Sequence, residues 1–143
     1  MSDLRVLLVD DEVDFLDALA ERLRMKGFTV VAADGGEAAL EAVEAQTFDA
    51  IVLDMAMPGM DGIETLERLL EGNRIRQVIL LTGRATLEQA ATAIRLGALD
   101  LMEKPADLET LVKKIELAAT KRWALEEKRI EEKVSDIIRK KGW

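Results

Sequence analysis

Short apolar runs alternate with amphipathic helical patterns along the chain. Five apolar runs predict strands, and the spacing of apolar residues between them predicts helices. The predicted strands cover residues 4–9, 29–33, 51–53, 78–81 and 99–102. The predicted helices cover residues 14–25, 36–45, 63–70 and 86–96, and a last one runs from near Asp107 almost to Trp143. This alternation predicts an α/β fold with helices on both faces of a parallel sheet.

Turn and capping signals separate these elements. Thr86 is followed three residues later by Gln89, a spacing that predicts a capping box at the start of a helix. Gly97 is typical of a residue that ends a helix. The segment DMAMPGMDG (54–62) contains proline and two glycines, so it predicts a loop.

The composition is typical of one folded domain. The chain has 143 residues, of which 49% are hydrophobic and 34% are charged. No apolar run approaches the ~20 residues that a membrane-spanning helix needs. The first residues lack the basic region and cleavage pattern of a signal peptide, and the chain has no cysteine. We therefore expect a cytoplasmic protein without membrane association.

The net charge and the absence of histidine argue against several functions. The net charge of −8 argues against nucleic-acid binding, which depends on Lys and Arg to neutralise phosphates. The chain contains no histidine, the commonest general base and a common metal ligand. Serine–histidine, cysteine–histidine and histidine–zinc chemistry are therefore excluded within this chain.

Unusual polar residues recur where the predicted strands end. In chain order they are Asp10 and Asp11 after the first strand, Asp54 after the third, Thr82 after the fourth and Lys104 after the fifth. The carboxyl ends of parallel strands form one edge of the sheet, where ligands of open α/β sheets bind. Three clustered carboxylates are hard oxygen ligands, which suit Mg²⁺ better than zinc. We therefore expect a magnesium site at this edge.

The same set of residues suits phosphoryl transfer. Asp54 would act as a nucleophile, as carboxylates do in enzymes that pass through an aspartyl phosphate. Lys104 would supply a positive charge and Thr82 a hydrogen bond to a phosphoryl oxygen. Each residue alone has a simpler explanation, since acids favour the start of a helix and aspartate favours turns. Their recurrence at equivalent strand ends favours one joint site.

Four segments of the chain resemble the receiver domain of two-component response regulators, the CheY-like superfamily. They are VLLVDDE (6–12), IVLDMAMPGMDG (51–62), LLTGRAT (80–86) and GALDLMEKP (97–105). Their order and spacing resemble this family over about residues 4–120. The resemblance implies a flavodoxin-like fold, a doubly wound five-stranded parallel sheet with strand order 2-1-3-4-5.

The resemblance also implies a reaction and its partners. Asp54 would accept a phosphoryl group from the phosphohistidine of a sensor histidine kinase or phosphotransfer protein. Asp10 and Asp11 would hold Mg²⁺ together with Asp54 and the backbone carbonyl of Ala56. The missing histidine would come from the partner protein.

Further residues would control the response in this family. Thr82 and Lys104 would bind the phosphoryl oxygens. Their movement would change the surface formed by helix four, strand five and helix five, to which a downstream protein target would bind. The sequence departs from the family at the switch position, where Leu101 replaces the usual tyrosine or phenylalanine. Ala56 and Arg84 would border the route of hydrolytic water.

The resemblance ends near residue 120, so we expect a receiver domain at 1–120 and a helical extension at 121–143. The apolar residues of the extension form a stripe at near-heptad spacing, which charged residues interrupt. The stripe consists of Trp123, Ile130, Val134, Ile137 and Ile138. The extension is interpreted either as a solvated tail or linker, or as a helix that forms a homodimer or packs on a partner.

The sequence thus predicts a stand-alone receiver that signals through protein contacts and is not an enzyme with a separate substrate. One alternative is a pseudo-receiver, a binding module that acts without phosphorylation. A phosphatase with an aspartate nucleophile is a second alternative, although such enzymes generally need a second acid two residues after the nucleophile, where this chain has Ala56. A flavin-binding protein is a third, although acids after the first strand would repel its phosphate.

Overall fold

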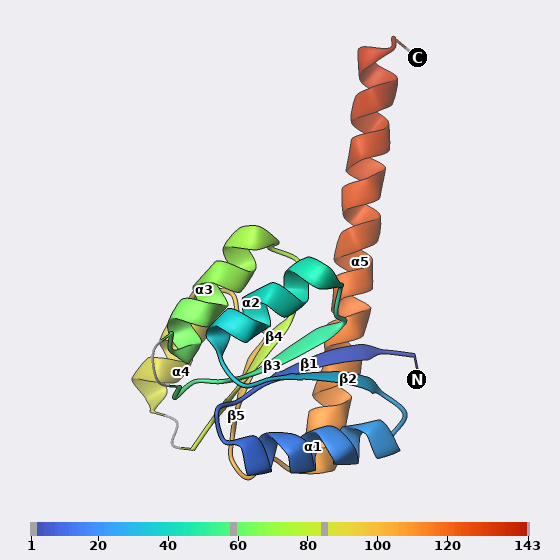
Figure 1. Cartoon of the computed structure of the whole chain (residues 1–143). Coiled ribbons are helices and arrows are strands. Elements are labelled where there is room, and N and C mark those ends of the chain that lie inside the picture. Colours follow the sequence, from blue (N-terminus) through green and yellow to red (C-terminus); the bar gives the residue numbers. More distant parts are fainter. Residues whose placement is uncertain (1–2, 58–59, 84–85, 143) are drawn as a thin grey trace.

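A computed structural model describes residues 3–57, 60–83 and 86–142, in which strands and helices alternate as predicted (Figure 1). All strand pairs are parallel, and the strand order is β2-β1-β3-β4-β5, which confirms the flavodoxin-like topology. The strands are β1 (Arg5–Val9), β2 (Thr29–Ala33), β3 (Ala50–Asp54), β4 (Val78–Thr82) and β5 (Asp100–Glu103). The helices are α1 (Val13–Met25), α2 (Gly36–Ala45), α3 (Gly62–Gly72), α4 (Leu87–Arg95) and α5 (Leu108–Lys140).

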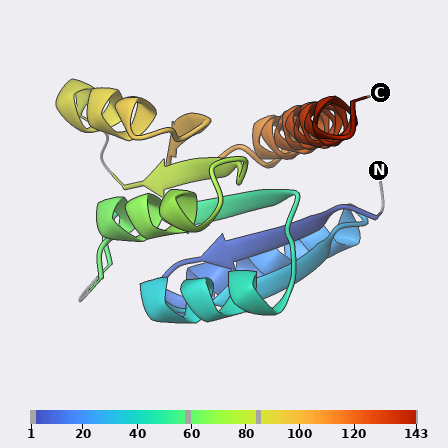
Figure 2. The ribbon, with the colours of Figure 1, turned by 90° about the horizontal axis from the view of Figure 1, so that it is seen from above.

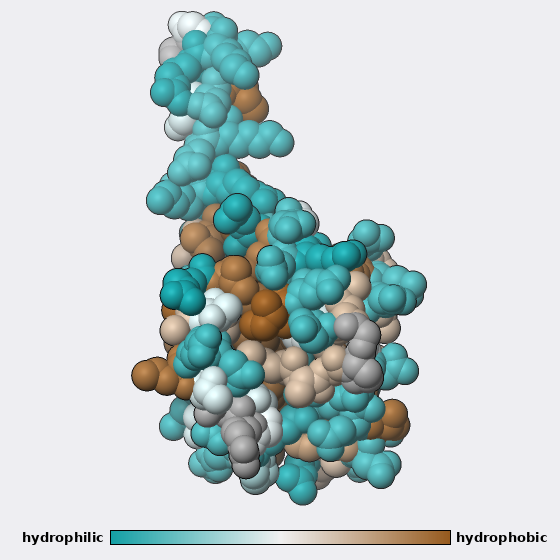
Figure 3. Space-filling model, turned by 90° about the vertical axis from the view of Figure 1, so that its left-hand side faces the viewer, coloured by the Kyte–Doolittle hydropathy of each residue, from teal (hydrophilic) through white to brown (hydrophobic). Residues whose placement is uncertain are grey.

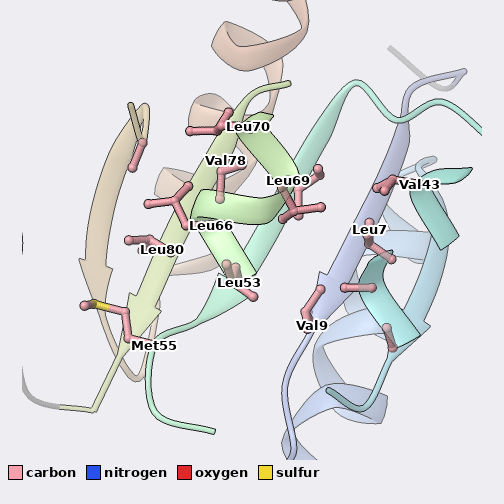
Figure 4. Close-up of a cluster of buried hydrophobic side chains, with 14 of the residues drawn as sticks. Leu7, Val9, Val43, Leu53, Met55, Leu66, Leu69, Leu70, Val78 and Leu80 are labelled. Atoms are coloured by element: carbon pink, nitrogen blue, oxygen red, sulfur yellow. The ribbon is translucent and has the colours of Figure 1, made fainter. Parts of the chain in front are cut away.

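Side chains of the sheet alternate between two apolar layers. On one face, Leu7, Leu53 and Leu80 pack in one apolar layer with residues of α2, α3 and α4. Figure 4 shows part of this layer, with the three leucines beside Leu66 and Leu69 of α3. On the other face, Leu8 and Ile79 pack against α1 and α5. Figure 2 shows the helices on the two sides of the sheet. Because both faces are covered, the central strands are apolar apart from residues at their ends, which is why they read as continuous apolar runs.

Backbone contacts explain where the elements differ from the predicted bounds. β3 is longer than the predicted strand because Ala50 pairs with Val6 of β1 and Asp54 pairs with Leu81 of β4. The predicted capping box of α4 is confirmed. Thr86 Oγ1 accepts a hydrogen bond from the backbone N–H of Gln89 at 3.1 Å, and the Gln89 side chain accepts one from the Thr86 N–H at 3.4 Å.

Gly62 allows α3 to begin directly against the end of β3. A Cβ atom at this position would lie 2.3 Å from the Cα of Met55 and 2.6 Å from the carbonyl oxygen of Asp54. The Gly62 N–H donates a hydrogen bond to the Met55 carbonyl at 3.0 Å. The close approach of these two backbone segments requires a residue without a side chain at position 62.

α5 is one continuous helix that packs on the sheet and then projects from it (Figure 1). Its packed part buries Leu111, Ile115 and Ala118. Near the end of this part, Arg122 forms an ion pair of 3.3 Å with Asp49, which precedes β3. The domain boundary at residue 120 stays a prediction, because the helix crosses it without a break.

Over the described ranges, none of the helices combines the length and the apolar composition that crossing a bilayer requires.

Candidate functional site

Three acidic side chains meet at the carboxyl-terminal edge of the sheet. Asp54 is the last residue of β3, and Asp10 directly follows β1; each is only 3% exposed. Asp11 is half-buried beside them. One carboxylate oxygen from each of the three lies within 4.8 Å of the others. The parallel topology thus places these acids together although 43 residues separate Asp11 from Asp54.

Lys104, which follows β5, brings a positive charge to these acids. Its ammonium nitrogen lies 2.7 Å from Asp10 Oδ2 and 3.5 Å from Asp54 Oδ1. The ammonium also lies 4.5 Å from the centre of the Phe15 ring, a cation–π contact from α1. The backbone fixes the start of this segment, because the Lys104 N–H donates to the Thr82 carbonyl at 2.7 Å.

Burial and charge change the pKa values of the central pair. Burial raises the pKa of Asp54 from 3.8 to about 6, with a further increase from Asp10, while Lys104 opposes the shift. Burial lowers the pKa of Lys104, but its contacts with Asp10 and Glu12 and the charges of Asp10 and Asp54 outweigh this effect and raise it overall. Lys104 therefore remains a cation at neutral pH.

The carboxylate of Asp10 has an oxygen suited to a metal ion. Its Oδ1 accepts a hydrogen bond from the Glu12 N–H at 2.9 Å, which satisfies one donor at the start of α1. Its Oδ2 is buried and forms an ion pair with the Lys104 ammonium at 2.7 Å. Together with Asp11 and Asp54, this oxygen forms a set of hard ligands of the kind that Mg²⁺ prefers. The residues present are therefore chemically suited to a divalent cation.

The structure describes three of the other predicted residues, Thr82, Ala56 and Leu101. Thr82, the last residue of β4, is 4% exposed at the same sheet edge. Ala56 is exposed, and its N–H lies 3.4 Å from Asp54 Oδ1 as a hydrogen-bond donor. Leu101 is half-buried in β5, where it is the register partner of Leu80 and packs on the layer under α2 to α4. Arg84 lies outside the described residues.

An open groove of about 740 Å³ runs from this edge toward α4. Ala56 and Thr82 line it near Asp54, and Thr86 and Gln89 line it at the start of α4.

Sequence reasoning missed one contact of the site, made by Glu12. Glu12 is the N-cap residue of α1, but its side chain makes no cap hydrogen bond. Its Oε1 lies 3.2 Å from Lys104 Nζ instead. The sequence does contain a signal for this contact. Glu12 is the third of three consecutive acids, and Lys104 is expected at the same edge of the sheet.

The chain is similar to one protein family, both by a family profile and by individual relatives. The profile of the response regulator receiver domain matches residues 6–116. The transcriptional regulatory protein ZraR of Escherichia coli (strain K12) is 36% identical over 116 residues, which are 81% of this chain and 26% of ZraR. The transcriptional regulatory protein FixJ of Bradyrhizobium diazoefficiens is 34% identical over 113 residues, 79% of this chain and 55% of FixJ. The chain thus spans about a quarter of ZraR and about half of FixJ.

Solved structures show the same fold. A receiver domain protein (CheY-like) from Methanospirillum hungatei matches with a TM-score of 0.80 and 28% identity, covering 86% of this chain and 98% of that chain. NtrX from Brucella abortus, in complex with ATP, matches with a TM-score of 0.79 and 29% identity, covering 96% of this chain and 30% of that chain. The similarity to NtrX therefore extends into the projecting part of α5.

Proposed function

Because this chain belongs to the response regulator receiver domain family, we propose that it is a signalling domain whose Asp54 accepts a phosphoryl group from a phosphohistidine of a partner kinase or phosphotransfer protein. The observation that supports this most directly is the position of Asp54. Its carboxylate is buried at the sheet edge with two more acids on one side and the Lys104 ammonium 3.5 Å away. A nucleophile beside a metal-ligand set and a fixed cation is the arrangement that phosphoryl transfer needs.

The proposed roles follow from these positions. An Asp54 carboxylate oxygen attacks phosphorus and forms the P–O bond, while the P–N bond breaks and the electron pair returns to the partner's imidazole. Bound Mg²⁺ would neutralise charge on the phosphoryl oxygens. Asp10, Asp11, Asp54 and the Ala56 carbonyl would hold the ion. Lys104 would bind a phosphoryl oxygen as a cation.

Thr82 and the groove toward α4 supply the proposed output. The Thr82 hydroxyl would donate a hydrogen bond to a phosphoryl oxygen, and the groove links its position to the start of α4. Leu101 cannot donate a hydrogen bond and has no ring, so the response would depend on Thr82 and α4 without an aromatic switch. The protein would act in the cytoplasm and would signal through contacts with a downstream protein. It would not turn over a separate substrate.

A pseudo-receiver that acts without phosphorylation is the alternative, and Leu101 is the observation in its favour. In that case the acids and Lys104 would stabilise one fixed conformation, and binding to a partner would not depend on a phosphoryl group.

Incubation with acetyl phosphate and Mg²⁺, followed by intact mass measurement, tests the proposal. We expect one phosphoryl adduct on the wild-type protein, none on Asp54→Asn, and none when a chelator removes Mg²⁺. Asp61→Asn is the matched control, because Asp61 caps α3 in the loop after Asp54 and is expected to leave the adduct unchanged. A wild-type protein without an adduct would favour the pseudo-receiver, and an adduct retained by Asp54→Asn would assign the acceptor to another residue.

A further inference from the structure

The projecting part of α5 carries an exposed apolar stripe. Trp123, Ile130 and Ile137 are seven residues apart and therefore lie on one side of the helix. They are 63%, 56% and 48% exposed, and Val134, between two of them, is 49% exposed. Exposed side chains of this size at heptad spacing are typical of a helix surface that pairs with another helix.

The stripe lies on one flank of α5. Ile115 faces the sheet, and Lys114 contacts Asp100 of β5 on one flank of the helix. With 3.6 residues per turn, Trp123 lies roughly 80° from Ile115 in the direction away from Lys114. The stripe therefore points away from β5, toward the side of the sheet that carries β1. The face of the tail seen from the side of α3 and α4 is mainly hydrophilic (Figure 3).

A groove on the body of the protein continues this stripe. It has a volume of about 200 Å³ and is lined mostly by apolar surface at the base of the tail. Its lining residues are Leu4, from the chain before β1, and Glu116, Ala119, Thr120 and Trp123 of α5. Trp123 belongs to both features, so the groove and the stripe form one surface, which we call the flank surface.

We propose that two copies of this chain associate through the flank surface with their α5 helices antiparallel. In this arrangement Trp123 of one copy faces Val134 of the other. Thr120, in the groove, faces Ile137 of the other copy. The contact has two-fold symmetry, so each copy supplies both the groove and the residue that enters it.

Charge complementarity selects the antiparallel direction. In the antiparallel pair, Glu126 faces Lys133 of the second copy, and Glu116 faces Lys141. Both contacts occur twice by symmetry. In a parallel pair in register, Glu127 of one copy would face Glu127 of the other, and Lys141 would face Lys141. Glu126 of one copy would lie near Glu131 of the other. The parallel pair therefore places like charges together, whereas the antiparallel pair brings opposite charges together.

This association uses no residue of the phosphoryl-acceptor site, so it does not depend on the proposed function. Because the apolar stripe is short and polar Glu127 interrupts it, we expect a dimer that forms reversibly as protein concentration rises.

Sedimentation of the unphosphorylated protein over a range of concentrations tests the association. We expect dimers at high concentration, and weaker association, by roughly three- to tenfold, for Glu126→Lys and for Lys133→Glu. The double variant restores opposite charges and should recover the wild-type affinity. Glu132→Lys makes the same charge change on the opposite flank and should leave the affinity unchanged. A protein that stays monomeric throughout, or a Glu126→Lys variant that associates more tightly, would overturn the proposal.

Disulfide cross-linking tests the direction independently, since the chain has no cysteine of its own. A mixture of Thr120→Cys and Ile137→Cys proteins should form cross-linked heterodimers under mild oxidation, and neither protein alone should do so. Efficient cross-linking of either protein with itself would indicate a parallel pair and refute the antiparallel arrangement. Circular dichroism of each variant verifies that α5 is folded.

Discussion

Asp54 is a buried acid whose ionisation opposes folding. Burial and the neighbouring Asp10 raise its pKa to about 6, whereas the carboxyl in the unfolded chain has its ordinary value of 3.8. The folded protein therefore binds this proton more tightly than the unfolded chain. The contribution of Asp54 to stability is most favourable below about pH 4 and is lost as the pH rises through about 6.

Replacing Asp54 by asparagine should therefore stabilise the protein at neutral pH. In the presence of a chelator at pH 7, we expect Asp54→Asn to raise the free energy of unfolding by about 2–3 kcal/mol, because the buried charge is removed. At pH 4 the carboxyl is largely protonated in the folded protein, so the difference should nearly vanish. Urea denaturation at the two pH values measures both quantities.

The control for this experiment is Glu41→Gln, which removes a carboxylate at an exposed position of α2. We expect a change of less than about 0.5 kcal/mol at either pH. A stabilisation by Asp54→Asn that is equal at pH 4 and pH 7 would contradict the assignment of the effect to ionisation.

Residue positions in the site were predictable to different degrees. The proximity of Asp11, Asp54 and Lys104 follows from parallel topology alone, because each residue lies at or just beyond the carboxyl end of a strand. The contact of Glu12 with Lys104 was not predictable in the same way, because it depends on how far one flexible side chain reaches across the edge. Its backbone is the N-cap of α1, a local role that says nothing of where the side chain reaches.

At the scale of the element, the start of α3 depends on Gly62. We expect Gly62→Ala to lower the free energy of unfolding by about 1–3 kcal/mol, because its Cβ would lie 2.3 Å from the Met55 Cα, a backbone atom that cannot rotate away. The same displacement would move the loop after Asp54, so we also expect slower formation of the phosphoryl adduct. Thermal unfolding and intact mass measured over time test the two effects.

Gly83→Ala is the matched substitution, because a Cβ at Gly83 would meet no atom of the described residues within 4 Å. It should leave the unfolding free energy within about 0.5 kcal/mol of wild type. An equal loss of stability in both variants would show that steric contact at Gly62 is not the cause.

Element types were predictable because the apolar periods are strong, but element ends depended on partners. The predicted third strand stopped at residue 53, and the structure extends β3 to Asp54 through its register with Leu81. The predicted third helix began at residue 63, one residue after the observed start at Gly62. The end of β3 is set by pairing with a segment that is distant in the chain, which local spacing does not contain. The start of α3 is set locally, because the Asp61 side chain accepts a hydrogen bond from the Glu64 N–H at 2.9 Å.

At the scale of the whole molecule, α5 belongs to the folded body only over its first part. We expect removal of residues 125–143 to change the free energy of unfolding by less than about 1 kcal/mol, because that part makes few contacts with the body. Removal of residues 117–143 should cost about 3 kcal/mol or more, since it deletes the buried Ala118 and Ala119 and the ion pair between Arg122 and Asp49. Urea denaturation at low protein concentration, where the chain is monomeric, compares the two truncations.

Equal stability of both truncated proteins would contradict a structural role for residues 117–124. This comparison also locates the end of the folded body, for which the sequence predicts residue 120 and the family match ends at residue 116. The ion pair explains why pattern alone is insufficient here. Arg122 reads as one of many charged residues of the tail, and only the fold shows that it meets Asp49.

The unbroken course of α5 through Arg122 makes the tail a lever arm. The helix continues for 18 residues from Arg122 to Lys140, a length of roughly 27 Å at 1.5 Å per residue. A tilt of about 10° where α5 leaves the body would therefore move Lys140 by roughly 5 Å. Small changes in packing at the base of the helix are mechanically amplified at its tip, whatever lies beyond it.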